Sequence, residues 1–397
     1  MDEPSEARLR AAFAAERASP GAPPDERWPV DVYRGGDWTA ERDRLFGRVW
    51  LPVAHASAVA TPGQWVAREV HGRPVVVVRG DDGALRAFRN LCVHRRAVVV
   101  RGDAGCARAG FTCPYHGVRY GLDGAVAAVP DGSVLPAAVA TDRLPPIPVR
   151  VAAGFVFVAA GDDPPPFDAF LPEALRAELD VWSVADLVPI ASRTWDGPFD
   201  WKLGVEAFIE PLHGPFLHPR TVAPFVNHRA SAMDAFGDHC RMALAFRDPR
   251  LYRPDGLLGR AAAAAGVGLL PGLGPLHREA NFVALLFPGW VVNLLPHHVT
   301  TIGFTPLGPR ATRVSLALYA PPPATDAARA FWATVWPGHV RLVEEDLENL
   351  RWLQQGVDDP AAGPLRLSRY ERQIGWFRAA VARWIVAGPT PGLTSAG

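Results

Sequence analysis

The chain has 397 residues, of which 49% are hydrophobic and 21% charged, a composition typical of soluble globular proteins with room for two domains. Its 41 basic and 41 acidic residues give a formal net charge of zero, so no basic excess favours nucleic acid or an anionic membrane as a partner. Four cysteines are too few for a disulfide framework in a chain of this length, so clustered cysteines and histidines favour metal binding.

The first 40 residues predict a helical lead-in to the first domain. They are rich in Ala, Pro, Glu and Arg, which predicts a short helix followed by extended chain. The opening M-D-E-P-S-E-A-R is charged and lacks the apolar core of a secretory signal. We therefore expect a cytoplasmic location.

Residues 41–162 show the pattern of a β domain. Short runs such as V-V-V-V at 75–78 and V-A-A-G-F-V-F-V at 151–158 read as strands. The stretches G-D-D-G at 80–83 and Y-G-L-D-G at 120–124 are typical of hairpin turns. Together they predict an antiparallel sheet structure up to about residue 160.

Two short cysteine-histidine pairs lie inside this β region. They are Cys92 and His94 in L-C-V-H-R-R, and Cys113 and His116 in C-P-Y-H-G. Four such ligands on two loops suit either tetrahedral zinc or a two-iron, two-sulfide cluster with cysteine on one iron and histidine on the other. The remaining cysteines, at 106 and 240, have no neighbouring histidine and are expected to be ordinary buried thiols.

A Pro-rich crossing at 161–168 indicates that a second domain covers 163–397. Within it, E-A-F-I-E-P-L-H-G-P-F-L-H-P at 206–219 places two imidazoles and two carboxylates in apolar chain, where a metal ion is a common partner. Two histidines and one carboxylate with an open face are the arrangement of non-haem Fe(II) oxygenases. His213 and His218 do not share one helix face, so Pro211 is expected to kink the helix and turn both toward one ion.

The rest of the second domain predicts a sheet and a long helix. Strand-like runs lie at 281–287, 290–295, 300–306 and 313–320. The apolar segment 254–275 is too broken by Gly, Pro and Arg for a membrane span, and a partly buried surface helix is favoured over a flexible lid. A long amphipathic helix is expected to begin near Thr325 and end near Gly356. Asp346 shares its helical spacing with Leu342, Asn349 and Leu353, so it is expected to face inward.

These motifs resemble those of a known family. C-V-H-R-R with C-P-Y-H-G-V-R-Y-G-L-D-G resembles the Rieske cluster motif, and D-W-K-L-G-V-E-A-F-I-E-P-L-H-G-P-F-L-H-P resembles the iron-site motif of Rieske non-haem iron oxygenase α subunits. The resemblance runs from F-G-R-V-W near residue 46 to R-Y-E-R-Q-I-G-W-F near 370. Two departures are Arg96, where a glycine commonly follows His-Arg, and Asp200, where an asparagine often precedes Trp-Lys. Neither replaces a ligand.

The resemblance implies an α+β fold: an N-terminal antiparallel-β Rieske domain plus a C-terminal helix-grip (START-like) catalytic domain with an antiparallel sheet and long helices. It implies a 2Fe-2S cluster on the two cysteine-histidine pairs, and one mononuclear Fe(II) per subunit on His213, His218 and Asp346. The carboxylate is chosen because E-D before Q-x-G resembles the family segment that supplies it. Glu345 stays the alternative, since neighbours on a helix are about 100° apart and only one can face the metal.

The same resemblance implies an oxygenase, either a mono- or a dioxygenase, that hydroxylates or oxidatively demethylates a small aromatic acid or an amine or quaternary ammonium compound. Dioxygen would be the co-substrate, and electrons would come from NAD(P)H through a separate flavin- or ferredoxin-type reductase, because no dinucleotide fingerprint follows a strand here. A homotrimer is implied, with Glu210 bridging His213 to a cluster histidine of the neighbouring subunit. Two other classes stay open: an electron-transfer or zinc-binding protein, and a helix-grip ligand-binding protein whose histidine pair is vestigial.

Overall fold

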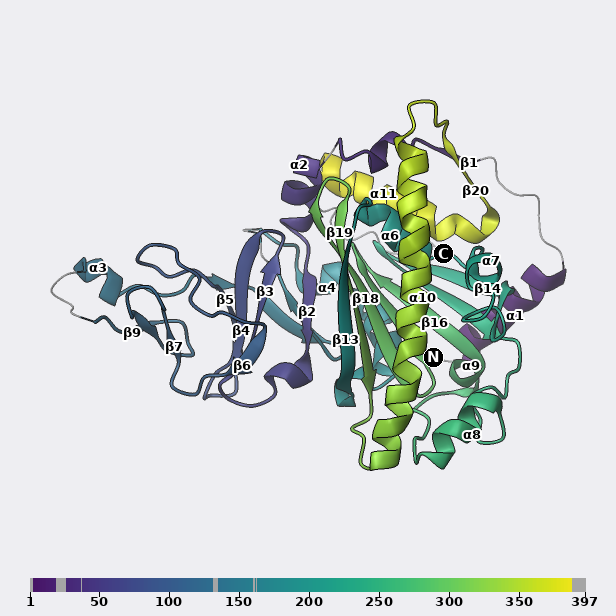
Figure 1. The fold of residues 1–397 in the computed structure, drawn as a ribbon, viewed down its shortest axis with the longest axis horizontal. Helices are drawn as coiled ribbons and strands as arrows, with labels where there is room; N and C mark the ends of the chain where they lie inside the picture. Colours follow the sequence, from purple (N-terminus) through teal and green to yellow (C-terminus); the bar gives the residue numbers. More distant parts are fainter. Residues whose placement is uncertain are drawn as a thin grey trace. The chain divides into compact units, whose positions relative to one another are not determined.

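The computed structural model describes residues 3–18, 26–36, 38–130, 135–159, 161 and 163–387. Two compact units result: one joins Met1–Leu45 to Leu171–Gly397, and the other is Phe46–Phe170 (Figure 1). The segment before residue 46 therefore packs with the C-terminal unit, although the chain passes through the other unit in between. The division of the sequence at 1–40, 41–162 and 163–397 stays a proposal.

The described residues of the unit Phe46–Phe170 form three antiparallel sheets, as the strand and turn pattern predicted. The five-stranded sheet has the order β10 (Pro146–Ile147), β5 (Leu85–Arg89), β4 (Arg73–Arg79), β3 (Gln64–Val70) and β6 (Ala104–Cys106). The three-stranded sheets are β11 (Val149–Ala152), β12 (Phe155–Val158) and β2 (Leu51–His55), and β7 (Phe111–Thr112), β8 (Arg119–Tyr120) and β9 (Val126–Ala128).

The valine run 75–78 is the centre of this unit because it is buried on both faces of β4. Its even-numbered valines pack with Phe88, Cys92 and Cys113 in one core cluster, whereas its odd-numbered valines pack in a second cluster with Val66. The period of two along a strand produces this division. Both predicted hairpin turns form; in the first, Gly83 has a φ of +77° and its N–H donates to the carbonyl of Gly80 at 3.0 Å.

The other unit contains a seven-stranded antiparallel sheet. Its order is β13 (Val188–Gly197), β19 (Ala311–Ala320), β18 (His298–Gly308), β17 (Trp290–Leu295), β16 (Ala280–Leu286), β15 (His239–Phe246) and β14 (Val226–Phe236). The four predicted strands are β16 to β19, and the sequence prediction missed the other three. Strands β14 and β15 carry His, Arg, Asp, Met and several Ala in place of β-branched runs, so their composition hides them.

Helix α10 (Asp326–Asp358) packs against β13, β19 and α6 (Trp201–Phe208) (Figure 1). Its N-cap is Thr325, as predicted, with the side chain accepting from the N–H of Ala328. Asp346 faces inward as expected, but its buried companions are Val343, Leu350, Gln354 and Val357. The expected companion Leu353 is 44% exposed, so the predicted apolar stripe was wrong in phase.

The segment 254–275 contains α8 (Leu257–Ala264), a surface helix whose Leu257 is exposed and whose Gly259 and Ala262 are buried. This matches the favoured expectation of a partly buried helix. Within the described ranges, no helix has the length and apolar character needed to cross a membrane. The other α-helices in the described part of this unit are α1 (Glu3–Ala18), α2 (Trp38–Ala40), α5 (Glu173–Asp180), α7 (Gly214–Leu217), α9 (Pro275–Glu279) and α11 (Arg372–Ala387).

The N-terminal segment is joined to the C-terminal unit by buried charges. Lys202, 1% exposed, lies 2.9 Å from Asp200 Oδ1 and also donates to Glu41. Tyr33 donates its hydroxyl to Glu206 Oε2 at 2.7 Å. The short strand β1 (Glu26–Trp28) pairs with β20 (Leu365–Leu367). Since buried charges need partners, residues before and after the Phe46–Phe170 unit depend on each other.

Candidate active site

The two histidines of the iron-site motif lie at the ends of one short helix. Helix α6 ends at Phe208, the chain turns through Pro211, and α7 then has His213 as its N-cap and His218 as its C-cap. The expected kink in a continuous helix was therefore wrong: Pro211 lies in the turn that separates two helices. A helix of about one turn brings its two caps to the same side, and the imidazole centroids are 5.1 Å apart.

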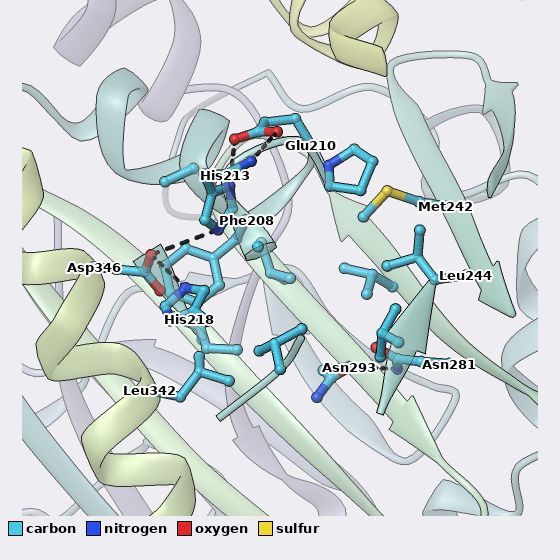
Figure 2. A pocket seen from close by; sticks show the side chains of 18 of the residues that line it. Phe208, Glu210, His213, His218, Met242, Leu244, Asn281, Asn293, Leu342 and Asp346 are labelled. Carbon is cyan, nitrogen blue, oxygen red and sulfur yellow. Dashed lines mark hydrogen bonds and ion pairs between the residues drawn. The ribbon is translucent and has the colours of Figure 1, made fainter. Parts of the chain in front are cut away.

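Asp346 on α10 completes a compact group with these histidines (Figure 2). Its Oδ1 lies 3.0 Å from His218 Nε2 and 3.7 Å from His213 Nε2. One ligand atom from each of the three residues lies within 4.8 Å of the others, and this is the one such group of three or more acidic, His or Cys residues in the described parts of the chain. The residues chosen from the sequence are thus brought together.

Each of these imidazoles has a glutamate on its other nitrogen. His213 Nδ1 contacts Glu210 Oε1, and His218 Nδ1 lies 2.8 Å from Glu345 Oε2. A carboxylate can only accept, so it favours the tautomer with the proton on Nδ1 and leaves the Nε2 lone pair for a metal. Glu345 therefore contacts Nδ1 of His218, whereas Asp346 contacts Nε2 of the same ring.

The sequence did not reveal this orienting contact of Glu345, which was considered only as an alternative ligand. The signal was present: Glu345 precedes Asp346 on one helix, so the two carboxylates point about 100° apart. Thr221 also donates its hydroxyl to Glu345 Oε2 at 2.7 Å, and Arg341 Nε lies 3.1 Å from Oε1. Three partners hold this carboxylate in place.

The electrostatics of the group favour a bound cation. Burial disfavours the charged form of both imidazoles, but Glu210 beside His213 and Asp346 beside His218 outweigh burial and raise the pKa of each histidine. Burial raises the pKa of Asp346 despite the nearby histidines. A positive charge among these groups is stabilised by the carboxylates, and two imidazole nitrogens with one carboxylate on one side fit a divalent first-row metal with open positions.

The group of His213, His218 and Asp346 lies at one end of a mostly apolar cavity of about 120 Å³. Its floor is one face of the sheet, because residues two apart on a strand share a face: Met242 and Leu244 on β15, and Val291 and Asn293 on β17. Figure 2 shows Met242, Leu244 and Asn293 across the cavity from the histidines and Asp346. An engineered apolar cavity of about 150 Å³ holds benzene, so this cavity suits a small molecule.

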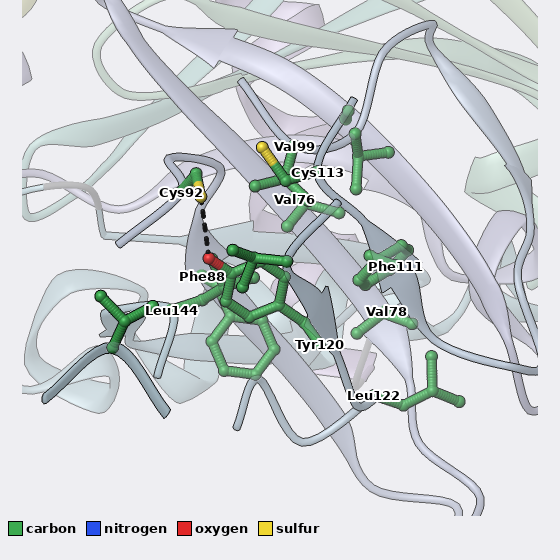
Figure 3. Close-up of a cluster of buried hydrophobic side chains, with 14 residues drawn as sticks. Val76, Val78, Phe88, Cys92, Val99, Phe111, Cys113, Tyr120, Leu122 and Leu144 are labelled. Atoms are coloured by element: carbon green, nitrogen blue, oxygen red, sulfur yellow. Dashed lines mark hydrogen bonds between the residues drawn. The ribbon is translucent and has the colours of Figure 1, made fainter. Parts of the chain in front are cut away.

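The two cysteine-histidine loops of the other unit have matching backbone geometry. Cys92 donates its N–H to Ala97 at 2.8 Å and accepts from Arg96, and Cys113 donates to Val118 at 2.8 Å and accepts from Gly117. Both thiols are buried in the core cluster of Figure 3. The two loops thus have equivalent backbone hydrogen bonds, and they place two thiols as neighbours in one core cluster.

Tyr120 contacts one of these sulfur atoms. Its hydroxyl donates to Cys92 Sγ at 3.1 Å and accepts from the N–H of Val93 at 3.1 Å (Figure 3). Tyr120 was missed from the sequence, although it lies in the second cysteine-histidine motif, seven residues after Cys113. A hydrogen bond to a ligand sulfur tunes a cluster's reduction potential.

The imidazoles of the two loops are also paired. The rings of His94 and His116 have centroids 4.7 Å apart, and His94 Nδ1 is buried without a hydrogen-bond partner in the described residues. Tetrahedral zinc would bring four ligand atoms within about 3.5–4 Å of one another. No three donors of the described loops lie within 4.8 Å of one another, so two separate pairs fit a two-metal cluster better than one ion. The unpaired Nδ1 suits a metal ligand.

The other two cysteines differ from each other. Cys240 is buried as expected. The expectation for Cys106 was wrong: its side chain is exposed, because it ends the edge strand β6, all of whose residues face solvent.

The two departures from the family motifs have structural consequences. Arg96 has a φ of +59°, and Gly117 at the equivalent position of the second loop has a φ of +73°. An arginine therefore adopts a left-handed conformation that favours glycine. Asp200 is the N-cap of α6, accepting from the N–H of Lys202, and it also pairs with the Lys202 ammonium. An asparagine could make the cap but not the ion pair.

Comparison with known proteins agrees with both sites. Residues 49–139 match the family described as "Rieske [2Fe-2S] domain", and residues 184–387 match "Ring hydroxylating alpha subunit (catalytic domain)". A similar curated protein is the carnitine monooxygenase oxygenase subunit of Acinetobacter pittii (strain PHEA-2), 32% identical over 203 residues, 50% of this chain and 54% of the relative. Another is the chlorobenzene dioxygenase subunit alpha of Cupriavidus sp. (strain PS12), 33% identical over 183 residues, 45% of this chain and 40% of the relative. The chain spans about half the length of the curated relatives it matches.

Solved structures share the fold. A quaternary ammonium Rieske monooxygenase matches with a TM-score of 0.76 at 22% identity, covering 90% of this chain and 95% of that chain. Naphthalene 1,2-dioxygenase from Rhodococcus sp. matches with a TM-score of 0.72 at 19% identity, covering 97% and 99%. The expected α+β architecture is confirmed. A matched Rieske domain is followed by a matched catalytic domain, residues 184–387, which makes up half of the chain. The chain therefore belongs to the ring-hydroxylating α-subunit family.

Proposed function

We propose that the chain is the oxygenase component of a Rieske oxygenase system that hydroxylates or oxidatively demethylates a small organic substrate. One observation carries this proposal. Two imidazole Nε2 atoms and the Asp346 carboxylate converge at the end of an apolar cavity, in a chain that also carries paired thiols and paired imidazoles. A binding protein would need the cavity but not two sets of metal donors.

On this proposal, His213, His218 and Asp346 hold Fe(II), and Glu210 and Glu345 orient the imidazoles. Ferrous iron there would supply the activation of dioxygen, with one side left open to it and to substrate. The apolar walls bind the carbon skeleton, exclude water from the reacting end and fix which carbon faces the metal. The buried Asp346 carboxylate lowers the positive charge of the site.

Cys92, His94, Cys113 and His116 are proposed to hold a 2Fe-2S cluster. A cluster with two imidazole ligands would supply electrons singly, at a potential above that of all-cysteine plant-type ferredoxins. The electrons are proposed to reach it from NAD(P)H through a separate flavin- or ferredoxin-type reductase. The relatives' names give carnitine and chlorobenzene as substrates of those proteins, so both amine oxidation and ring hydroxylation stay within the proposal.

Metal analysis of paired variants tests the ligand assignment. Protein purified without oxygen is expected to be brown-red and to hold mononuclear iron in addition to the cluster iron. Asp346→Ala should lose the mononuclear iron and turnover but keep the visible spectrum, and Cys113→Ala should lose the spectrum. Cys106→Ala is the matched control and should keep both. A colourless wild-type protein that contains zinc would refute the proposal.

We further propose a homotrimer in which each iron receives electrons from the cluster of the neighbouring subunit. A head-to-tail contact that closes on itself forms such a ring. Phe216 on α7, between the two iron-site histidines, is 80% exposed, and Tyr115 beside His116 is 52% exposed. Exposed aromatic rings beside both sites are typical of surfaces that become buried by association.

Mixed oligomers test this assembly. His116→Ala removes the cluster and His213→Ala removes the iron, so neither homo-oligomer should turn over. Co-expressed hybrids, verified by mass, should regain part of the activity, because some contacts pair an intact cluster with an intact iron. Fully inactive hybrids, made from parents that each keep the other metal, would contradict electron transfer between subunits.

A further inference from the structure

A row of polar side chains crosses the otherwise apolar floor of the cavity. Asn281, Asn293 and Thr300 line it from the neighbouring strands β16, β17 and β18. Asn293 and Thr300 are direct partners across β17 and β18. Figure 2 shows Asn281 and Asn293 on the opposite side of the cavity from His218 and Asp346. The row is therefore available to the part of a substrate that lies away from the reacting end.

The hydrogen bonds within this row have a fixed direction. The amide nitrogen of Asn281 donates to the carbonyls of Leu294 at 3.2 Å and Phe282 at 3.3 Å, and to Asn293 Oδ1 at 2.6 Å. Only the NH₂ end can donate to backbone carbonyls, so the Asn281 side chain cannot be flipped. Asn293 in turn donates to Thr300 Oγ1 at 3.2 Å. The row thus ends in an amide oxygen that can accept at Asn281 and a hydroxyl hydrogen that can be donated at Thr300.

The remaining walls carry no charge that could pair with an ionic substrate. The cavity-lining carboxylates are Glu210 and Asp346, both at the metal end, and Glu210 already contacts His213 and the N–H of Leu212. Neither lysine nor arginine lines the cavity in the described residues, and Phe208 is the one phenyl, phenol or indole side chain among them. Burial lowers the pKa of His339 to about 4 and also lowers the pKa of His228, so both imidazoles are neutral at pH 7.

These observations decide between substrate classes. A carboxylate or quaternary ammonium group in the far half of the cavity would lose its hydration without gaining a counter-ion or an aromatic cage. An uncharged hydrogen-bonding group would keep its hydrogen bonds there, since the row offers both an acceptor and a donor. We propose that the row of Asn281, Asn293 and Thr300 binds the uncharged polar group of a small, otherwise apolar substrate. The inference rests on the proposed function and narrows its substrate class to neutral molecules.

Ligands of similar shape but different charge test which property of the substrate the cavity selects. The oxygen-free holoenzyme is titrated by calorimetry with benzamide, its anionic isostere benzoate, its apolar isostere isopropylbenzene, and L-carnitine. Benzamide should bind at least about tenfold more tightly than benzoate or carnitine, because an unpaired buried charge costs more than a lost neutral hydrogen bond. Asn293→Leu and Thr300→Val should each weaken benzamide about tenfold and leave isopropylbenzene nearly unchanged. Leu316→Met, on the same floor, should not alter the ratio between these two ligands.

Two results would overturn the inference. One is benzoate or carnitine binding as tightly as benzamide, and the other is equal weakening of benzamide and isopropylbenzene in both row variants. Failure of the proposed function is separate, because binding is measured without turnover. A protein with the predicted selectivity that never consumes dioxygen would refute the oxygenase proposal alone, whereas an active carnitine oxygenase would refute the inference alone.

Discussion

Glu345 is predicted to determine how tightly the iron is held although it is not a proposed ligand. Its Oε2 lies 2.8 Å from His218 Nδ1, and this contact leaves Nε2 facing Asp346. Loss of a carboxylate behind a metal-binding imidazole typically weakens metal affinity by 10–100-fold, which corresponds to about 1.4–2.7 kcal/mol. Glu345→Gln keeps an oxygen that can accept from Nδ1–H and Thr221 but removes the charge, so we expect iron to bind about tenfold more weakly. Glu345→Ala removes both the oxygen and the charge, so we expect iron to bind about 100-fold more weakly.

The effect on folding should be smaller than the effect on iron. Glu345 is 22% exposed on its side chain, and its ion pair with Arg341 is a surface pair, worth less than about 1 kcal/mol. The assay is the Fe(II) retained per 2Fe-2S cluster against a chelator of known affinity, with unfolding followed separately. Glu344→Gln is the matched control, because this neighbour pairs with Arg193 at 3.0 Å and makes no hydrogen bond or ion pair with the two histidines among the described residues.

Two outcomes would refute this reasoning. If Glu345→Ala binds iron as tightly as the wild type, the contact with His218 does not orient the imidazole. If Glu345→Ala loses iron completely while Asp346→Ala keeps it, Glu345 is itself the ligand.

Four further predictions concern the cluster loop, a buried ion pair, Arg96 and the iron-site histidines. Tyr120→Phe removes a hydrogen bond to Cys92 Sγ that favours the electron-rich reduced cluster, so its reduction potential should fall by about 20–60 mV in a redox titration. Lys202→Met leaves two buried carboxylates unpaired and should lower the free energy of unfolding by roughly 3–5 kcal/mol, whereas Arg313→Met at an exposed pair should cost less than about 1 kcal/mol in the same urea titrations. Arg96→Gly should raise the free energy of unfolding by about 0.5–1 kcal/mol in thermal unfolding. The strain of an arginine in the left-handed region costs more than the extra unfolded-state entropy that glycine adds. Iron affinity should fall in chelator titrations as the pH drops through the pKa of the two iron-site histidines, because both imidazoles have a raised pKa and must lose their protons to bind metal.

The proposed metal ligands could be chosen from the sequence, whereas the backbone that presents them could be predicted only in part. The spacing of Cys92, His94, Cys113 and His116 and of the iron-site histidines is local, so it can be read directly. That Asp346 faces inward also followed from helix period, but the rest of the stripe did not, because the buried face of α10 includes Gln354 in place of a leucine.

The missed features depend on tertiary structure. Strands β14 and β15 are held by pairing with each other and with β16, and not by their own β-propensity. Pro211 ends a helix and does not kink one, because a proline in a turn between two helices breaks no intrahelical hydrogen bond. The polar row on the cavity floor joins residues of three strands, and no pattern within one strand identifies it.

The pairing of Lys202 with Glu41 makes the Rieske unit an insertion within a discontinuous catalytic fold. A fragment that begins at Leu171 would contain the proposed iron ligands yet lack Glu41, the Tyr33 hydroxyl and the strand partner of β20. Truncation at Leu171 is therefore expected to destabilise the part of the chain that contains the proposed iron site. A chain in which a linker joins residue 45 to residue 171 would keep those partners, and metal binding at the proposed iron site could then be measured without the visible absorption of a cluster.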